Sequence, residues 1–92
     1  MSDESKLYDA ISRASQVSAL LENGELNRAL DEMKTQLIDL WVQSPAKDVV
    51  GREKLHVAIN QIYMFKERLR IVLDGGKLAQ ADLNARSKRA AA

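Results

Sequence analysis

Three stretches of this chain place an apolar residue at alternating three- and four-residue steps. They comprise Leu7, Ala10, Ala14, Val17 and Leu21; Leu26, Leu30, Met33, Leu37 and Leu40; and Leu55, Ala58, Ile62, Phe65, Leu69 and Val72. This spacing puts each set along one face of an α-helix and is typical of helices that pack against other helices. We therefore predict an all-α protein with three amphipathic helices.

Residues that break helices separate the first two apolar stripes from each other and from the third. Asn23-Gly24 is a turn signal, and Pro45 biases the residue before it away from helical geometry. We expect the first two helices over residues 3–22 and 25–43. Because only a short link joins them, we expect them to form an antiparallel helical hairpin.

The third helix is expected to be the longest. Asp48 is a suitable N-cap, and Gly75 and Gly76 are residues that tolerate the left-handed conformation in which many helices end. Its expected range is therefore 49–73. The hairpin and this helix together make a predicted three-helix bundle over residues 1–76.

Residues 77–92 differ from the predicted bundle in charge. They contain four Lys or Arg and one Asp, a net charge of +3, whereas residues 1–76 contain ten basic and twelve acidic residues, a net charge of −2. We expect a basic tail that is partly helical or disordered. Its cations Arg86, Lys88 and Arg89 are candidate nucleic-acid contacts, and a solvated tail is the alternative interpretation.

Self-association is expected because the chain has few other means of stabilisation. A chain of 92 residues buries only about two-thirds of its unfolded surface, and this one contains no cysteine to form a disulfide or a thiolate metal site. Apolar residues also widen the stripes of the second and third helices. Those expected at a partner or oligomer interface are Trp41, Ile59, Tyr63 and Ile71. For Trp41 the alternative is packing within the protomer.

A polar stripe runs beside the apolar face of the third helix. It consists of Arg52, His56, Asn60, Tyr63 and Glu67. These residues either line a shallow ligand site or form an ordinary flank of the bundle. His56 is the sole histidine, and neither a convincing nucleophile nor a phosphate-binding glycine motif accompanies it. The sequence therefore predicts no enzymatic activity, no metal site and no cofactor.

Hydropathy and the N-terminal residues bear on the location of the protein. No apolar run approaches the roughly 20 residues of a membrane span. The opening residues, Met1-Ser2-Asp3-Glu4-Ser5, are acidic where a signal peptide is basic. We therefore expect a soluble protein of the cytoplasm that does not interact with membranes.

Four short segments resemble a group of small all-helical proteins encoded by tailed bacteriophages and prophages, often near head and packaging genes. The segments are Ala19-Leu20-Leu21-Glu22-Asn23, Leu40-Trp41 with Ser44-Pro45, Arg52-Glu53-Lys54-Leu55, and Val72-Leu73-Asp74-Gly75-Gly76-Lys77-Leu78-Ala79. The resemblance covers residues 17–83. It implies a viral protein in the host cytoplasm or associated with the virion. It also implies a non-enzymatic role in assembly, packaging or interference with a host protein.

These features lead to one preferred function and two alternatives. The preferred function is that of a non-enzymatic, phage-type interaction or assembly protein that acts as a homo-oligomer and contacts a phage or host protein. The first alternative is a DNA-binding packaging accessory similar to a small terminase subunit, although the chain has no clear helix-turn-helix. The second is a helical protein that binds a small molecule, such as a nucleotide, through the polar stripe.

Overall fold

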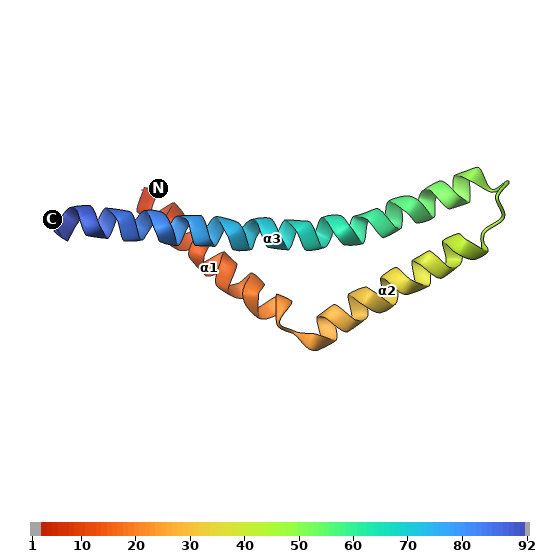
Figure 1. Ribbon diagram of the computed structural model, residues 1–92, viewed down its shortest axis with the longest axis horizontal. Helices are drawn as coiled ribbons and strands as arrows, with labels where there is room; N and C mark the ends of the chain where they lie inside the picture. The colour runs from red at the N-terminus through yellow and green to blue at the C-terminus, as the bar shows by residue number, and fades with distance from the viewer. Residues whose placement is uncertain (1–2, 92) are drawn as a thin grey trace. The chain divides into compact units, whose positions relative to one another are not determined.

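The computed structural model of this protein describes residues 3–91. It is all-helical: α1 spans Asp3–Leu21, α2 spans Gly24–Gln43 and α3 spans Val49–Ala91, and no strand occurs among the described residues (Figure 1). The predicted all-α class with three helices is confirmed. The predicted bounds of the first two helices agree with those of α1 and α2 to within one residue.

Short polar side chains precede α2 and α3 and cap them. Asn23 has an extended backbone, and its Oδ1 accepts hydrogen bonds from the backbone N–H groups of Glu25 at 3.0 Å and Leu26 at 3.1 Å. Oδ1 of Asp48 accepts the N–H of Gly51 at 3.0 Å, which confirms the predicted cap of the third helix. Each carboxyl or amide oxygen thus satisfies backbone donors that have no partner in the first turn of a helix.

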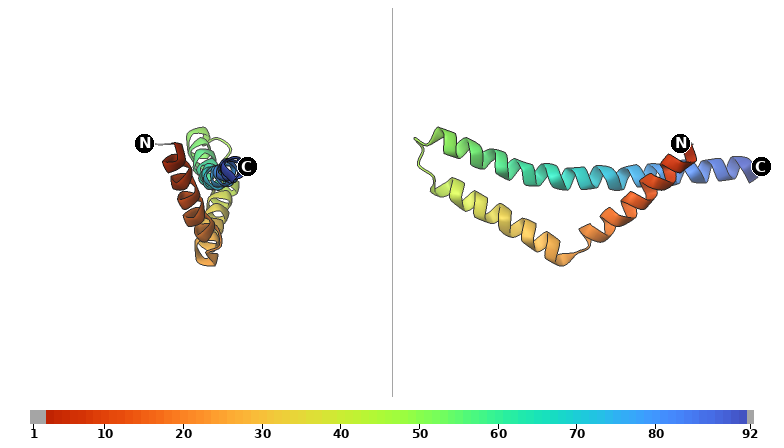
Figure 2. Two further views of the ribbon diagram at one scale, coloured as in Figure 1. Left: turned by 90° about the vertical axis from the view of Figure 1, so that its left-hand side faces the viewer. Right: turned by 180° about the vertical axis from the view of Figure 1, so that it is seen from behind.

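The contacts within the chain divide it into two units. The central unit, Asn23–Glu67, contains α2 and the first part of α3, whereas the terminal unit contains α1 and residues 68–91 of α3. Figure 2 shows α1 beside the C-terminal part of α3 within the terminal unit. α1 and α2 belong to different units, so the predicted hairpin of these two helices stays a prediction. Within the central unit, α2 forms a hairpin with the first part of α3, through the loop of residues 44–48.

α3 continues to Ala91 instead of ending at residue 73, so the predicted end of the third helix is wrong. The described part of the predicted tail, residues 77–91, belongs to this helix. None of the described glycines has a positive φ, so neither Gly75 nor Gly76 forms a left-handed helix stop. The apolar stripe in fact continues in the same steps through Gly76, Ala79 and Leu83, which are buried or half-buried.

Gly76 is a packing residue of the terminal unit. A Cβ atom at this position would overlap the Cβ atom of Ala14 on α1 and would lie 3.2 Å from the carbonyl oxygen of Ala10. The missing side chain therefore allows the two backbones to approach closely. At Gly75, by contrast, a Cβ atom would meet nothing within 4 Å. The two adjacent glycines thus have different surroundings.

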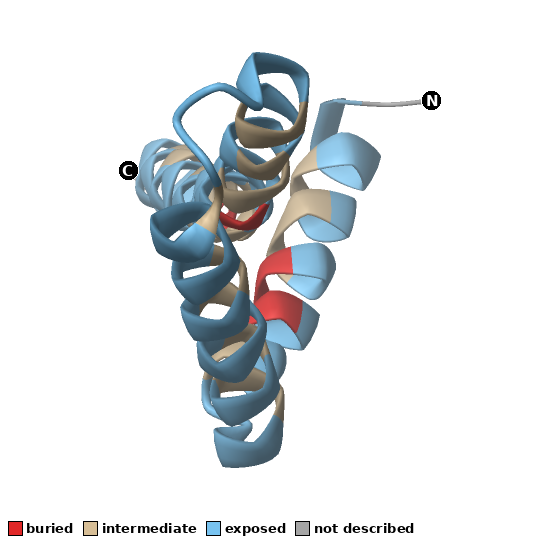
Figure 3. Ribbon diagram, turned by 90° about the vertical axis from the view of Figure 1, so that its right-hand side faces the viewer, coloured by how far each residue is buried: buried red, intermediate tan, exposed pale blue. Residues whose placement is uncertain are grey.

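Few apolar side chains are buried. Those of the described residues are Ala14, Val17, Ile62 and Ala79, and exposed ribbon predominates in Figure 3. Ala14, Val17 and Ala79 belong to the terminal unit. Among its described residues, the central unit therefore buries Ile62 alone.

The substitution Gly76→Ala tests the close approach of α1 and α3. The added methyl group must displace Ala14, which costs about 1–3 kcal/mol, while the higher helix propensity of alanine returns roughly 1 kcal/mol. The free energy of unfolding should therefore fall, by up to about 2 kcal/mol, in chemical denaturation. Gly75→Ala is the matched control, because its methyl group enters open space. It should raise stability by up to about 1 kcal/mol, and equal stabilisation by both substitutions would contradict the contact.

Candidate interaction surface

Arg52 fastens the loop between α2 and α3. Its Nη1 donates hydrogen bonds to the carbonyl oxygens of Trp41 and Ser44, both at 3.1 Å, and to Oγ of Ser44 at 2.8 Å. The guanidinium carbon lies 4.4 Å from the centroid of the Trp41 ring, a cation–π distance. The carbonyl oxygen of Trp41 also accepts the backbone N–H of Ser44 at 3.2 Å. Arg52, at the beginning of α3, therefore adds a charged donor to carbonyl groups at the end of α2, where the helix itself supplies few donors.

Polar contacts join α2 to α3 along one flank of the central unit. Nζ of Lys66 lies 3.2 Å from Oδ1 of Asp31, and Nζ of Lys34 lies 5.6 Å from the centroid of the Tyr63 ring. The ion pair is partly exposed to solvent, so its contribution to stability is small. These contacts nevertheless show which side chains cover this flank of the hairpin.

An apolar groove lies between α2 and α3 in the central unit, and we call it the α2–α3 groove. Its lining residues are Leu30, Met33, Leu37, Ala58, Gln61, Ile62 and Phe65. Met33 is 51% exposed and Phe65 is 46% exposed, so large apolar side chains of both helices face solvent here. No charged side chain belongs to the described lining, and Gln61 is its one polar member.

The apolar surface of the groove extends outward along α3. Val57 and Met64, which precede and follow Gln61 by four and three positions, are 51% and 55% exposed. Ala58 and Phe65 stand three positions before and four positions after Gln61, and both line the groove. Because residues three and four positions apart share a helix face, apolar side chains surround Gln61. Exposed apolar patches of this kind are typical of interaction sites.

Six of the seven groove residues belong to the second and third predicted apolar stripes. The sequence thus identified these side chains, but as the core of a bundle and not as an exposed surface. Gln61 was missed because it belongs to neither the apolar nor the polar stripe. The signal that could have found it is one uncharged polar residue with apolar residues at positions i−4, i−3, i+3 and i+4.

The four predicted interface residues lie in different surroundings and do not line the α2–α3 groove. Trp41 is 39% exposed and contacts Arg52, so it is neither fully buried nor fully accessible. Ile59 is half-buried, and Tyr63 is largely exposed. Ile71 is also exposed, in the terminal unit. Their assignment to an interface stays a prediction.

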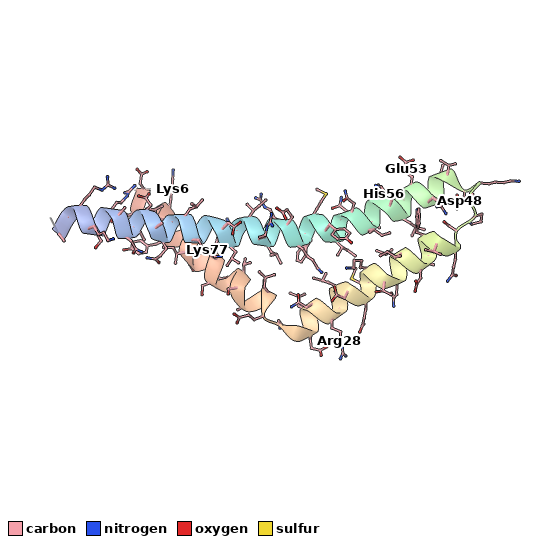
Figure 4. The ribbon with its side chains drawn as sticks, in the orientation of Figure 1. Lys6, Arg28, Asp48, Glu53, His56 and Lys77 are labelled. Carbon is pink, nitrogen blue, oxygen red and sulfur yellow. The ribbon has the colours of Figure 1, made fainter. Side chains whose placement is uncertain are left out.

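Two members of the predicted polar stripe, Arg52 and Tyr63, contact residues outside α3. The guanidinium of Arg52 binds the loop, whereas His56, Asn60 and Glu67 are exposed. In Figure 4, His56 projects from α3 on the side away from α2. No residue of the stripe lines the α2–α3 groove. A ligand site at this stripe stays a prediction.

A second hollow lies along α2 alone, on a charged face, and is lined by Gly24, Asn27, Arg28, Asp31, Glu32, Thr35 and Gln36. Arg28 on this face pairs with Glu25 at 3.7 Å and with Glu32 at 3.5 Å, and Figure 4 shows it projecting away from α3. Exposed pairs at i, i+3 and i, i+4 are ordinary features of a solvated helix face. The α2–α3 groove is therefore the better candidate for an interaction site.

The predicted nucleic-acid contacts lie near the end of α3. Nε of Arg86 is 3.2 Å from Oδ1 of Asp82, and the hydrogen bond and charge of Asp82 raise the pKa of Arg86. Lys88 and Arg89 are exposed in the last turn of the helix. Cations at this end also stabilise the helix through its dipole. Their positions therefore have a structural explanation that requires no nucleic acid.

Among residues 3–91, no three side chains of the His, Cys, Asp or Glu type come together in a way that would hold a metal ion. None of the three helices has the length and apolar character needed to cross a bilayer.

Comparison of the chain with protein-family models, curated proteins and solved structures gives no significant match. The function is therefore inferred from the residues of the α2–α3 groove and from the sequence itself.

Substitution of Arg52 tests the fastening of the loop. Arg52→Ala should lower the free energy of unfolding by about 1–2 kcal/mol, because the carbonyl groups of Trp41 and Ser44 lose a charged donor. Arg52→Lys keeps the charge but not the planar fork, so its effect should be intermediate. Urea denaturation followed by tryptophan fluorescence measures both. Lys54→Ala, at an exposed position of the same helix, is the control and should change stability by less than about 0.5 kcal/mol. An equally small loss of stability in Arg52→Ala would argue against a stabilising contact between Arg52 and the loop.

Proposed function

We propose that this chain is a non-enzymatic, phage-type interaction and assembly protein that acts as a homo-oligomer through the α2–α3 groove. The observation that carries the proposal is the exposure of large apolar side chains on both helices of a unit that buries Ile62 alone. Burial of a side chain such as Met33 or Phe65 contributes about 1.5–3 kcal/mol when it is complete. The uncovered groove therefore represents a substantial driving force for association.

The groove of a second copy is a suitable partner for this groove, because both are apolar and uncharged. Four-helix bundles cover the apolar stripes of two hairpins against each other, and the central unit supplies one such hairpin. Because no charged side chain belongs to the described lining, two copies can face each other there without like-charge repulsion. Self-association is thus supported by both the apolar and the electrostatic character of the groove.

The phage origin and the contact with a phage or host protein are supported by sequence alone. The resemblance to small helical phage proteins over residues 17–83 includes the segments around Trp41, Arg52 and Gly76. These segments lie at the end of α2, at the start of α3 and at the α1 contact. The resemblance therefore includes residues that form the α2–α3 loop and the contact between α1 and α3.

The two alternative functions have less support. A DNA-binding packaging accessory would use Arg86, Lys88 and Arg89, of which Arg86 pairs with Asp82. A small-molecule binding protein would use the polar stripe, in which Arg52 binds the loop. Binding experiments with duplex DNA and with nucleotides test these two alternatives.

The substitution Phe65→Glu tests self-association through the groove. We expect the native protein to sediment as more than one protomer at micromolar concentrations. A buried carboxylate at position 65 should weaken this association at least about tenfold, or 1.4 kcal/mol. Sedimentation velocity over a concentration series measures the effect, and circular dichroism checks that the helices remain.

Leu78→Glu is the matched control for this experiment. Leu78 is 73% exposed and belongs to the terminal unit, so it lies outside the groove. Its substitution adds the same charge to the same helix and should leave association unchanged. A native protein that is monomeric at every concentration would exclude the proposed function, and equal effects of the two substitutions would exclude the groove as its site.

A further inference from the structure

Gln61 is the one polar side chain in the described lining of the α2–α3 groove. In the protomer it is exposed, so water can satisfy its amide. When another surface covers the groove, that water is displaced and the amide needs a new hydrogen-bond partner. The partner must therefore present a donor and an acceptor at this point of an otherwise apolar contact.

We propose that Gln61 specifies the pairing of two copies of this chain, by a hydrogen bond between its side-chain amide and that of Gln61 in the second copy. The inference rests on the proposed self-association. A glutamine amide contains both an NH₂ donor and a carbonyl acceptor, so two identical amides satisfy each other. At a two-fold axis a residue meets its own copy. A self-complementary group in the groove thus points to a second copy as its occupant.

The neighbours of Gln61 suit such a pair. Ala58, three positions earlier, is the smallest side chain of the lining. Val57 and Met64 are exposed on the same side of α3, and they would exclude water once covered. A single polar residue within an apolar helix seam fixes register and the number of chains, at a cost in stability. Gln61 has the surroundings for that role.

The substitution Gln61→Glu separates this pairing from simple apolar contact. At pH 7 two facing carboxylates repel, so the dissociation constant should rise at least about tenfold. Below the ordinary glutamate pKa of about 4.3 the carboxyl groups are neutral and can pair. Association should then return towards that of the native protein measured at the same pH. Sedimentation velocity at both pH values provides the readout.

Asn60→Asp is the matched control for the charge. It adds one carboxylate at the adjacent position of α3, which lies outside the groove lining. Its dissociation constant should stay within about twofold of the native value at pH 7 and show no recovery in acid. If Gln61→Glu behaves like this control while the native protein still associates, the pairing of Gln61 is excluded and the proposed function stands.

Gln61→Leu tests the specifying role. It removes the amide but keeps the groove apolar, so copies should still associate, without a fixed register. We expect more than one oligomeric species by sedimentation where the native protein gives one. A single species with an unchanged dissociation constant would overturn the inference. A native protein that never associates would instead overturn the proposed function on which it rests.

Discussion

Each shorter helix has one helical neighbour within its unit, namely a part of α3, and this limits how much apolar surface the protomer can bury. In the terminal unit, small residues allow two helices to pack closely: Gly76 lets α1 approach α3, and Ala14 and Ala79 are buried. The central unit has larger side chains on a single pair of helices. Met33 and Phe65 therefore remain half-exposed beside Ile62. The same constraint thus produces a tight contact in one unit and an open groove in the other.

Much of the secondary structure could be predicted because it depends on local chemistry. Pro45 ends α2, and Asp48 caps α3, through interactions that span a few residues. The pairing of helices could not be predicted in this way, because an apolar stripe shows which face is covered but not which helix covers it. The double glycine was misleading for a related reason. Gly76 is a good stop residue by local rules, yet its lack of a side chain serves a contact with Ala14, which is distant in sequence.

The sequence predicted which residues form the candidate surface, but it did not predict that they are exposed to solvent. Periodicity identified Met33 and Phe65 as apolar-face residues, whereas their accessibility depends on how many helices surround them. The placement of Trp41 at an interface or in a core stays a prediction. Residue type did not predict the contact of its ring with the guanidinium of Arg52 at the loop. Gln61 was not predicted, because it is a polar residue among apolar neighbours and belongs to neither stripe.

The contact between Gly76 and Ala14 links two positions that are far apart in the sequence. Side chains between packed helices fill the available space, so an added methyl group on one helix requires a smaller side chain on the other. Because a Cβ atom at position 76 would overlap that of Ala14, the combined volume of the two side chains is limited. Related chains that preserve this crossing of α1 and α3 should therefore vary at these positions in concert, so that a larger residue on one helix accompanies a smaller one on the other.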